Sequence, residues 1–357
     1  MRLVKYIRKS PLSILVLAFL LAILAKLAHW EPLWIFIFSA LGVIPLAGFI
    51  GEATESLAYI TGPRLGGLLN ATLGNAAELI ITVVAIREGL LELVKASITG
   101  SILGNLLLVL GMAVLFGGLR NGVQTFNRKY ASSNAILLVL AVLTLLIPSL
   151  LSQYIGKEGS PKVEALSLGV AGVMIVLYGL GLLFGYKSNK GPLTVESEET
   201  NVTAPTWSLK NALIILVVAT VGVAYLSELL VGSVEPVVAK LGVSEFFIGI
   251  IFIPIIGNVA EHLVAVQVAI KNKMALSVEI AVASSLQIAL FVAPVLVFTS
   301  LFLGHPLTIV FNQFELLALI AGVLIAALVS SDGETNWLEG AELLAIYLIL
   351  GLAFFLM

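Results

Sequence analysis

Two glutamates lie within long apolar stretches of this chain, with no basic residue close by in the sequence. Glu78 lies in Leu-Gly-Asn-Ala-Ala-Glu-Leu-Ile-Ile-Thr-Val-Val, and Glu261 lies in Gly-Asn-Val-Ala-Glu-His-Leu-Val. An unpaired carboxylate in the middle of a bilayer costs about 2.5–3.5 kcal/mol, and such residues mark ion or proton pathways. Each glutamate therefore predicts a functional site. The alternative for either one alone is a protonated carboxyl that is hydrogen-bonded inside a helix bundle.

The surroundings of the two glutamates match. Asn75 and Thr82 lie three residues before and four residues after Glu78, so all three share one helix face. Asn258 stands in the same relation to Glu261, and a shift of 183 residues (261 − 78) superposes the two motifs. The same shift pairs Gly66 with Gly249, Gly74 with Gly257, Ala77 with Ala260, Glu52 with Glu235 and Ser101 with Ser284. The chain therefore contains an internal repeat, which favours the functional reading of both glutamates.

Two carboxylates and two amides supply hard oxygen ligands, which suit calcium. Calcium takes six to eight oxygens at about 2.3–2.6 Å in a flexible shell. Glu78 and Glu261 would neutralise its charge, with Asn75 and Asn258 as further ligands. Loss of the metal would leave two negative charges in a low dielectric, so protons are the natural replacement. The residues thus predict a metal site that exchanges calcium for protons.

Helix irregularities are expected beside these ligands. Gly74, Gly257 and Pro254 allow local breaks that expose backbone carbonyls, although glycine and proline also serve plain helix packing in membranes. His262 follows Glu261 directly and is expected to join the two glutamates in proton coupling, or else to be a satisfied interior histidine. Zinc would prefer a tetrahedral set of His or Cys ligands, which this motif lacks.

Further polar residues are expected to support or serve the site. The supporting polar shell is predicted to comprise Thr82, Ser101, Asn105, Ser284, Ser285 and Gln287. Small polar residues of this kind also act simply as contacts between membrane helices. The access paths are predicted to be lined by Glu52, Glu55, Glu228 and Glu235, for which ordinary interfacial glutamates are the alternative.

The composition requires a membrane environment for these residues. The chain has 357 residues, of which 60% are hydrophobic and 11% charged, and its mean hydropathy is +1.12. Soluble domains carry about 25% charged residues. A formal net charge of −2 provides no basic surface for nucleic acid, and the absence of cysteine excludes disulfides, thiolate metal sites and thiol redox chemistry. The partners expected are therefore membrane lipid, a divalent cation and protons.

Apolar stretches bounded by charges, glycine or proline predict an all-α polytopic membrane protein with about eleven transmembrane helices. The expected spans are 11–28, 33–60, 65–86, 93–118, 131–152, 162–186, 208–231, 243–270, 274–303, 312–330 and 337–356. Thirteen of the 19 Lys and Arg residues then share the side of the amino terminus, which the positive-inside rule makes cytoplasmic. The host membrane would be the plasma membrane of a prokaryote or an organelle membrane.

The span count also sets the relation between the repeats. Five spans separate equivalent helices, so the two copies cross the membrane in opposite directions, as in many secondary transporters with a midplane site. The expected organisation is an amino-terminal helix (1–30), a first repeat of five helices (31–186), a cytoplasmic acidic linker (187–207) and a second, inverted five-helix repeat (208–357).

These motifs resemble the α-repeats of cation/proton exchangers of the calcium/cation antiporter superfamily. The resemblance rests on Gly-Glu-Ala-Thr-Glu at 51–55, Gly-Asn-Ala-Ala-Glu-Leu-Ile at 74–80 and Gly-Asn-Val-Ala-Glu-His at 257–262, and it extends over nearly the whole chain. It implies that Glu78 and Glu261 are alternating calcium and proton ligands. It further implies that the asparagines assist, and that two helices slide past a core to alternate access.

Three other functions remain as alternatives. One is a sodium/calcium exchanger, and another is a proton-coupled exchanger of manganese or another divalent ion. An intramembrane metal-dependent enzyme is the third, and it is disfavoured because Asp332 is the only aspartate and no His-Glu-x-x-His motif occurs. We therefore expect a carrier that is not an enzyme, that has no cofactor and that transports Ca2+ and H+, with Mn2+ or Na+ as alternative ions. The sequence indicates no oligomeric state.

Overall fold

A computed structural model describes residues 15–126, 128–188 and 207–357. The basic amino-terminal residues 1–14 lie outside this description. So does the predicted acidic linker apart from its ends, so the predictions for both segments stay untested.

The described chain is helical apart from one short ribbon. The first half contains α2 (Val16–Leu27), α3 (Pro32–Thr61), α4 (Pro63–Leu73), α5 (Ala76–Arg87), α6 (Leu91–Leu103), α7 (Leu110–Asn121), α8 (Arg128–Ile155) and α9 (Pro161–Ser188). The second half contains α10 (Leu209–Val231), α11 (Val234–Leu241), α12 (Glu245–Phe247), α13 (Ile253–Ile270), α14 (Met274–Gln287), α15 (Ala293–Leu303), α16 (Gln313–Val329) and α17 (Trp337–Phe355). Strands β1 (Gln124–Thr125) and β2 (Glu334–Thr335) pair antiparallel. The predicted all-α class is confirmed.

Local sequence signals explain several helix ends. Gly62 adopts a φ of +84° between α3 and α4, and Pro63 then starts α4 at a position where its missing N–H costs nothing. Asn312 and Asn336 each form a capping box, with Glu315 and Glu339 respectively, at the start of α16 and α17. Polar residues thus define where these apolar helices begin.

Eight stretches in the described residues are long and apolar enough to cross a membrane, and α2 and α16 are shorter apolar helices. The α4–α5 stretch is divided, so it forms no single long helix. The predicted number of eleven spans therefore remains a prediction. The helices at the centre of the bundle are more buried than those at its edge. Within 91–121, 72% of the most apolar 18-residue segment is buried, against 22% of the corresponding segments in 161–184 and 337–355.

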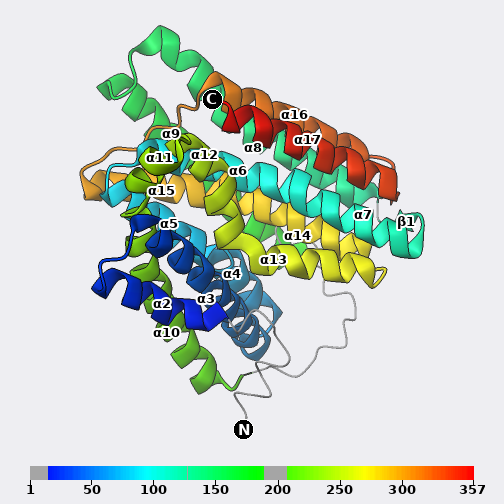
Figure 1. The fold of residues 1–357 in the computed structure, drawn as a ribbon. Helices are drawn as coiled ribbons and strands as arrows, with labels where there is room; N and C mark the ends of the chain where they lie inside the picture. The colour runs from blue at the N-terminus through cyan, green and yellow to red at the C-terminus, as the bar shows by residue number, and fades with distance from the viewer. Residues whose placement is uncertain (1–14, 127, 189–206) are drawn as a thin grey trace.

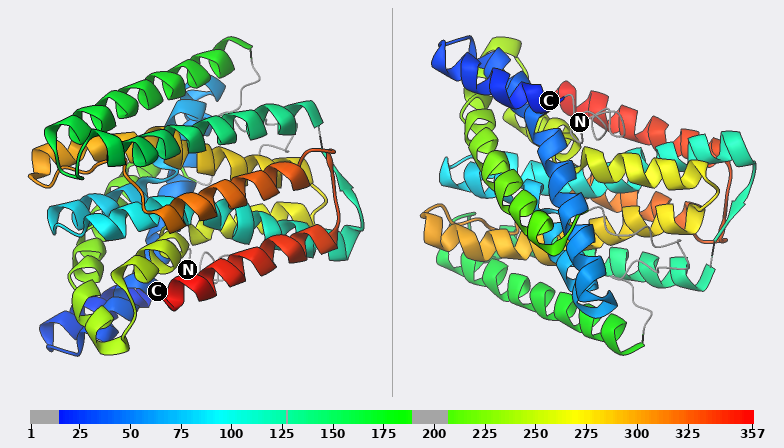
Figure 2. Two further views of the ribbon diagram at one scale, coloured as in Figure 1. Left: turned by 90° about the horizontal axis from the view of Figure 1, so that it is seen from above. Right: turned by 90° about the horizontal axis from the view of Figure 1, so that it is seen from below.

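Helices α3 and α10 form a pair that differs in direction from the rest. They pack along each other, with α2 against α3, and they cross the remaining helices at a steep angle (Figures 1 and 2). They contact the rest of the bundle mainly through α4, α5 and α13. The two helices that carry the predicted ligand motifs are therefore the ones against which this pair rests.

Three π-helical segments interrupt the central helices. They are η2 (Gly104–Val109), η3 (Ile248–Phe252) and η4 (Ile288–Val292). Segments η2 and η4 lie at positions related by the 183-residue shift, and Asn105 and Gln287 lie in or next to them. Helix α6 passes close to η3 at Gly100. A Cβ added at this glycine would lie only 2.0 Å from the carbonyl oxygen of Ile250, so a larger residue would not fit. Such π-segments commonly occur at functional sites.

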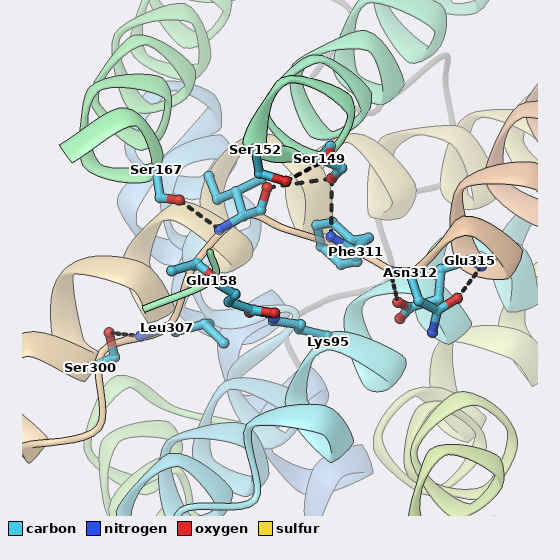
Figure 3. Close-up of polar contacts among 12 residues, drawn as sticks. Lys95, Ser149, Ser152, Glu158, Ser167, Ser300, Leu307, Phe311, Asn312 and Glu315 are labelled. Carbon is cyan, nitrogen blue, oxygen red and sulfur yellow. Dashed lines mark hydrogen bonds and ion pairs between the residues drawn. The ribbon is translucent and has the colours of Figure 1, made fainter. Parts of the chain in front are cut away.

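The connection between α15 and α16 is held by serine side chains from α8, α9 and α15 (Figure 3). The backbone N–H groups of Leu307, Ile309 and Phe311 donate to the hydroxyls of Ser300, Ser167 and Ser149, at 2.8, 3.0 and 3.0 Å respectively. These contacts fix the start of α16 behind α6, where Glu315 is buried and accepts a hydrogen bond from Thr99. Thr99 and Ser101 are two residues apart on α6, so their side chains lie on opposite faces of this helix.

Candidate cation site

Glu78 stands at the start of a half-helix. Helix α4 ends at Leu73, Asn75 is the residue before α5, and Glu78 occupies the first turn of α5. The predicted irregularity at Gly74 is therefore observed. A helix amino terminus favours negative charge, and the Glu78 side chain is 0% exposed.

Both carboxylate oxygens of Glu78 accept a hydrogen bond. Ser101 Oγ donates to Oε1, and Asn258 Nδ2 donates to Oε2 at 3.3 Å. One donor comes from each half of the chain. Thr82 Oγ1 instead donates to the backbone carbonyl of Glu78 at 2.7 Å, so its proton serves the helix backbone rather than the carboxylate.

Glu261 has a more open setting. Its side chain, on α13, is partly exposed, and Oε2 accepts a hydrogen bond from Ser284 Oγ at 3.2 Å. Asn105 Nδ2 donates to that same Ser284 hydroxyl at 3.0 Å. A residue of the first half thereby orients the hydroxyl that binds the glutamate of the second half.

Helix α13 runs without interruption through Gly257, so the predicted break at this glycine is wrong. The irregularity in this copy is η3, which ends just before Pro254. Gly257 instead permits close packing, because a Cβ added there would lie 3.5 Å from the Glu78 Cβ. Close approach of α5, rather than a change of backbone direction, accounts for this glycine.

The two motifs face each other. A Cβ added at Gly74 would lie 3.2 Å from Glu261 Oε1, so the Gly-Asn segment of each half lies against the glutamate of the other half. The two glutamates therefore lie on motifs that face each other across the two halves, and their joint role as metal ligands stays a prediction.

Amides complete the surroundings of the pair. Asn75 Nδ2 donates to Gln287 Oε1 at 2.8 Å. The Asn75 Oδ1 atom is buried and has no hydrogen-bond partner among the described residues. The Asn75 side chain thus contacts Gln287 through its nitrogen, while its oxygen receives no hydrogen bond from the described residues.

The other predicted residues occupy varied positions. Ser285 Oγ donates to the Ala281 carbonyl of its own helix at 2.9 Å, and His262 is buried. In the described part of the chain, no three His, Cys, Asp or Glu residues gather as a metal cluster. A cation here would depend on two carboxylates and neutral oxygens.

The glutamates predicted to line access paths differ in setting. Glu55 is exposed near the end of α3, and Glu52 lies about one turn earlier on the same helix. Glu228 accepts a hydrogen bond from Arg87 Nη1 at 3.0 Å, which links α10 to the end of α5. Glu235 is exposed on the separate helix α11.

One buried residue beside Glu78 was not singled out in the sequence. Ser97 lies one turn before Ser101 on α6, so both hydroxyls belong to the same helix face. The four-residue spacing to Ser101 was the available signal. Without the packing of α5 on α6, a lone serine gives no indication of what it faces.

Known proteins are similar to this chain over most of its length. The family described as sodium/calcium exchanger protein matches residues 31–187 and 211–356. The chain is 47% identical over 353 residues to a Ca(2+)/H(+) antiporter of Aphanothece halophytica, covering 94% of this chain and 93% of that protein. It is 46% identical over 345 residues to the Ca(2+)/H(+) antiporter ChaA of Bacillus subtilis (strain 168), covering 94% and 96%. The solved structure of native YfkE superposes with a TM-score of 0.85 at 43% identity, covering 97% of this chain and 100% of that one. The chain therefore belongs to the sodium/calcium exchanger protein family.

Proposed function

We propose that this integral membrane protein is a secondary antiporter that exchanges calcium for protons. The observation that carries the proposal is the pair Glu78 and Glu261, brought together from the two halves and surrounded by amide and hydroxyl oxygens. Two relatives that are 46–47% identical over nearly their whole length bear the name Ca(2+)/H(+) antiporter, which supports the same function.

The residues suggest how exchange would be coupled. Glu78, Glu261, Asn75 and Asn258 would supply calcium ligands, and two carboxylates would balance its charge. When calcium leaves, the buried carboxylates cannot both stay charged in a low dielectric, so each would take up a proton. Calcium and protons would thus compete for one site, and opposite gradients would drive exchange.

The arrangement of α3 and α10 suggests how access would alternate. This pair crosses the helices that hold the ligands and contacts both α5 and α13. Movement of the pair would uncover the site toward one end or the other. By the positive-inside rule we place the amino terminus, and hence the end of α3 that carries Glu55, in the cytoplasm.

Calcium uptake into proteoliposomes tests the proposal. The purified protein is reconstituted, a pH gradient is imposed without sodium, and radiolabelled calcium uptake is followed. We expect uptake that stops when a protonophore dissipates the gradient. Uptake that requires an opposing sodium gradient instead would contradict proton coupling and assign the protein to sodium/calcium exchange.

Selectivity can be measured in the same vesicles. Hard oxygen ligands and a charge of two carboxylates favour divalent over monovalent ions, and calcium over zinc. We expect calcium to compete best in a series that includes manganese and sodium. A stronger competition by manganese would change the proposed substrate but not the mechanism.

A further inference from the structure

Two amide side chains of the first half hold the carboxyl end of α13. The last carbonyl groups of a helix have no partner within the helix itself, so other groups must satisfy them. Gln124 Nε2 donates to the Ala269 carbonyl at 3.0 Å and to Asn272 Oδ1 at 2.9 Å. Asn121 Nδ2 donates to the Ala269 and Ile270 carbonyls at 3.3 and 3.2 Å. The end of α13 is thereby tied to the end of α7 and to β1.

Gln124 is the more firmly placed of the two amides. It is 2% exposed, whereas Asn121 is exposed. Its backbone pairs with Thr335 in the β1–β2 ribbon, which lies at the end of α7 in Figure 1. A Cβ added at Gly117 would lie 2.2 Å from Gln124 Oε1 and 3.2 Å from the Ala269 carbonyl oxygen, so glycine leaves room for this amide. Water cannot easily replace a donor that is buried in this way.

The carboxyl end of α5, the helix that carries Glu78, is held differently. The 183-residue shift places Gly304 and Leu307, which have no side-chain amide, at the positions of the two amide residues (121 + 183 and 124 + 183). The end of α5 instead contacts α10, because Arg87 Nη1 donates to Glu228 at 3.0 Å. Helix α5 is thus tied to the α3–α10 pair, whereas α13 is tied to α7, which packs against α13, α14 and α17.

Helix α13 packs against α3 as well as against α7. A Cβ added at Gly48 of α3 would lie 3.8 Å from the Cβ of Ala260, the residue before Glu261. Movement of α3 would therefore act on α13 beside its ligand. The helix is continuous over Ile253–Ile270, and Glu261 lies about 12 Å along its axis from Ala269. Because a continuous helix moves as a unit, a hold at its end fixes the position of Glu261.

We propose that Gln124, assisted by Asn121, is a positioning residue, which holds α13 on α7 so that Glu261 stays beside Ser284 while α3 and α10 move. This inference rests on the proposed function. It goes beyond it in assigning a role to two residues outside the repeated motifs, and in dividing the ligand helices between the two parts that move past each other. Helix α13 belongs to the stationary part, and the end of α5 is linked to the moving pair.

Amide substitutions give the first test. Gln124→Met keeps the length of the side chain but removes both donors, and we expect the KM for calcium to rise about 5- to 20-fold. Asn121→Ala should raise it only about 2-fold, because water can replace an exposed donor. A role in stability alone would lower the amount of folded protein and leave the KM of the folded protein unchanged.

Disulfide formation between α3 and α13 gives a second test that does not depend on flux. The chain has no cysteine, and the 3.8 Å separation of the two Cβ positions suits a disulfide between Gly48→Cys and Ala260→Cys. With Gln124 present, α3 moves past a fixed α13, so we expect calcium saturation at constant pH to change the rate of disulfide formation at least about fivefold. With Gln124→Met, α13 follows α3, and we expect a change below about twofold.

Asn336→Ala is the matched control. Asn336 lies at the same end of the bundle and caps α17 by accepting hydrogen bonds from the backbone N–H groups of Leu338 and Glu339. Loss of this cap destabilises the protein without touching a contact of α13. We expect a lower Tm, a wild-type calcium KM and calcium-dependent disulfide formation. A rise in KM as large as that of Gln124→Met would assign both effects to lost stability and overturn the proposal.

The outcomes separate this inference from the function on which it rests. If the wild type shows no proton-driven calcium uptake, the proposed function fails. If the wild type exchanges calcium for protons and Gln124→Met has a wild-type KM, only the positioning role fails. Disulfide formation that is independent of calcium with Gln124 present, or equally dependent on calcium with Gln124→Met, would also overturn that role.

Discussion

Glu78 and Glu261 occupy equivalent positions in the sequence but unequal environments in the structure. Glu78 is fully buried, and each of its carboxylate oxygens accepts a hydrogen bond, one from each half of the chain. Glu261 is partly exposed and has one hydroxyl donor, Ser284. The structure is therefore closed around one ligand and more open at the other. A repeated motif can thus provide two ligands that differ in how tightly they are held.

Removal of either carboxylate is expected to have the largest effect on calcium uptake. We expect Glu78→Gln and Glu261→Gln each to reduce proton-driven calcium uptake at least about 100-fold, because either change removes a charged ligand and a proton carrier. Uptake into proteoliposomes measures the effect. If the two glutamates were equally accessible, the two variants would bind calcium and protons with the same affinities.

Glu315→Gln provides the control for these two variants. Glu315 is 2% exposed and lies behind α6, away from the site. Glutamine also serves in a capping box, so the start of α16 is preserved. We expect near-wild-type uptake, and a loss as large as that of Glu78→Gln would show that any buried glutamate is required.

Substitution of the two serine donors tests whether Glu78 and Glu261 depend equally on their hydrogen bonds. Ser101→Ala removes one of two donors from a fully buried carboxylate, where water cannot replace it, and we expect the calcium KM to rise about 10- to 100-fold. Ser284→Ala removes the one hydroxyl donor of Glu261, a residue that is less completely buried than Glu78, so we expect a smaller rise of about 3-fold. Initial rates over a calcium series would measure both. Equal effects would contradict the inequality of the two glutamates.

Substitutions of two amide side chains should show energetic coupling only when the two side chains are hydrogen-bonded to each other. Asn75 donates to Gln287, whereas Asn258 donates to Glu78. A double-mutant cycle of Asn75→Ala and Gln287→Ala should give a coupling energy of about 1 kcal/mol in calcium affinity, equivalent to about 5-fold. Asn258→Ala combined with Gln287→Ala should be nearly additive. Coupling in the second cycle but not in the first would contradict the observed pairs.

The smallest effect is expected at the ion pair between α5 and α10. Arg87 and Glu228 are both about half exposed, with side-chain exposures of 49% each. Exposed pairs contribute about 0–1 kcal/mol and weaken with salt. We expect Arg87→Gln to change the uptake rate about 2-fold at low salt and to match the wild type at high salt. A change of tenfold or more, independent of salt, would assign this pair a larger role.

The sequence indicated much of the fold because hydropathy and helix-end signals are local. The expected ranges 33–60 and 274–303 lie close to α3 (Pro32–Thr61) and to the stretch from α14 to α15, Met274–Leu303. The interruption at Gly74 was also predicted. Gly257 was misjudged, because glycine serves both helix breaks and close packing, and only the neighbouring helix decides between the two.

The contacts of the candidate site could not be predicted in the same way. Asn258 was placed with Glu261 on its own helix, whereas its amide reaches Glu78 on the other half of the chain. Ser97 was overlooked, because its position beside Glu78 follows from the packing of α5 on α6. Helical periodicity identifies which residues share a face, but it gives no information on which face of another helix they meet.

The most direct test of the two-carboxylate site is calcium binding with proton release measured together. Calorimetric titration of the purified protein in buffers of different ionisation enthalpy yields both quantities over a series of pH values. The account predicts that wild-type protein releases protons as calcium binds, that the release disappears at alkaline pH, and that Glu78→Gln and Glu261→Gln each lose calcium binding. Calcium binding at wild-type affinity in either variant, or binding without proton release at every pH, would contradict it.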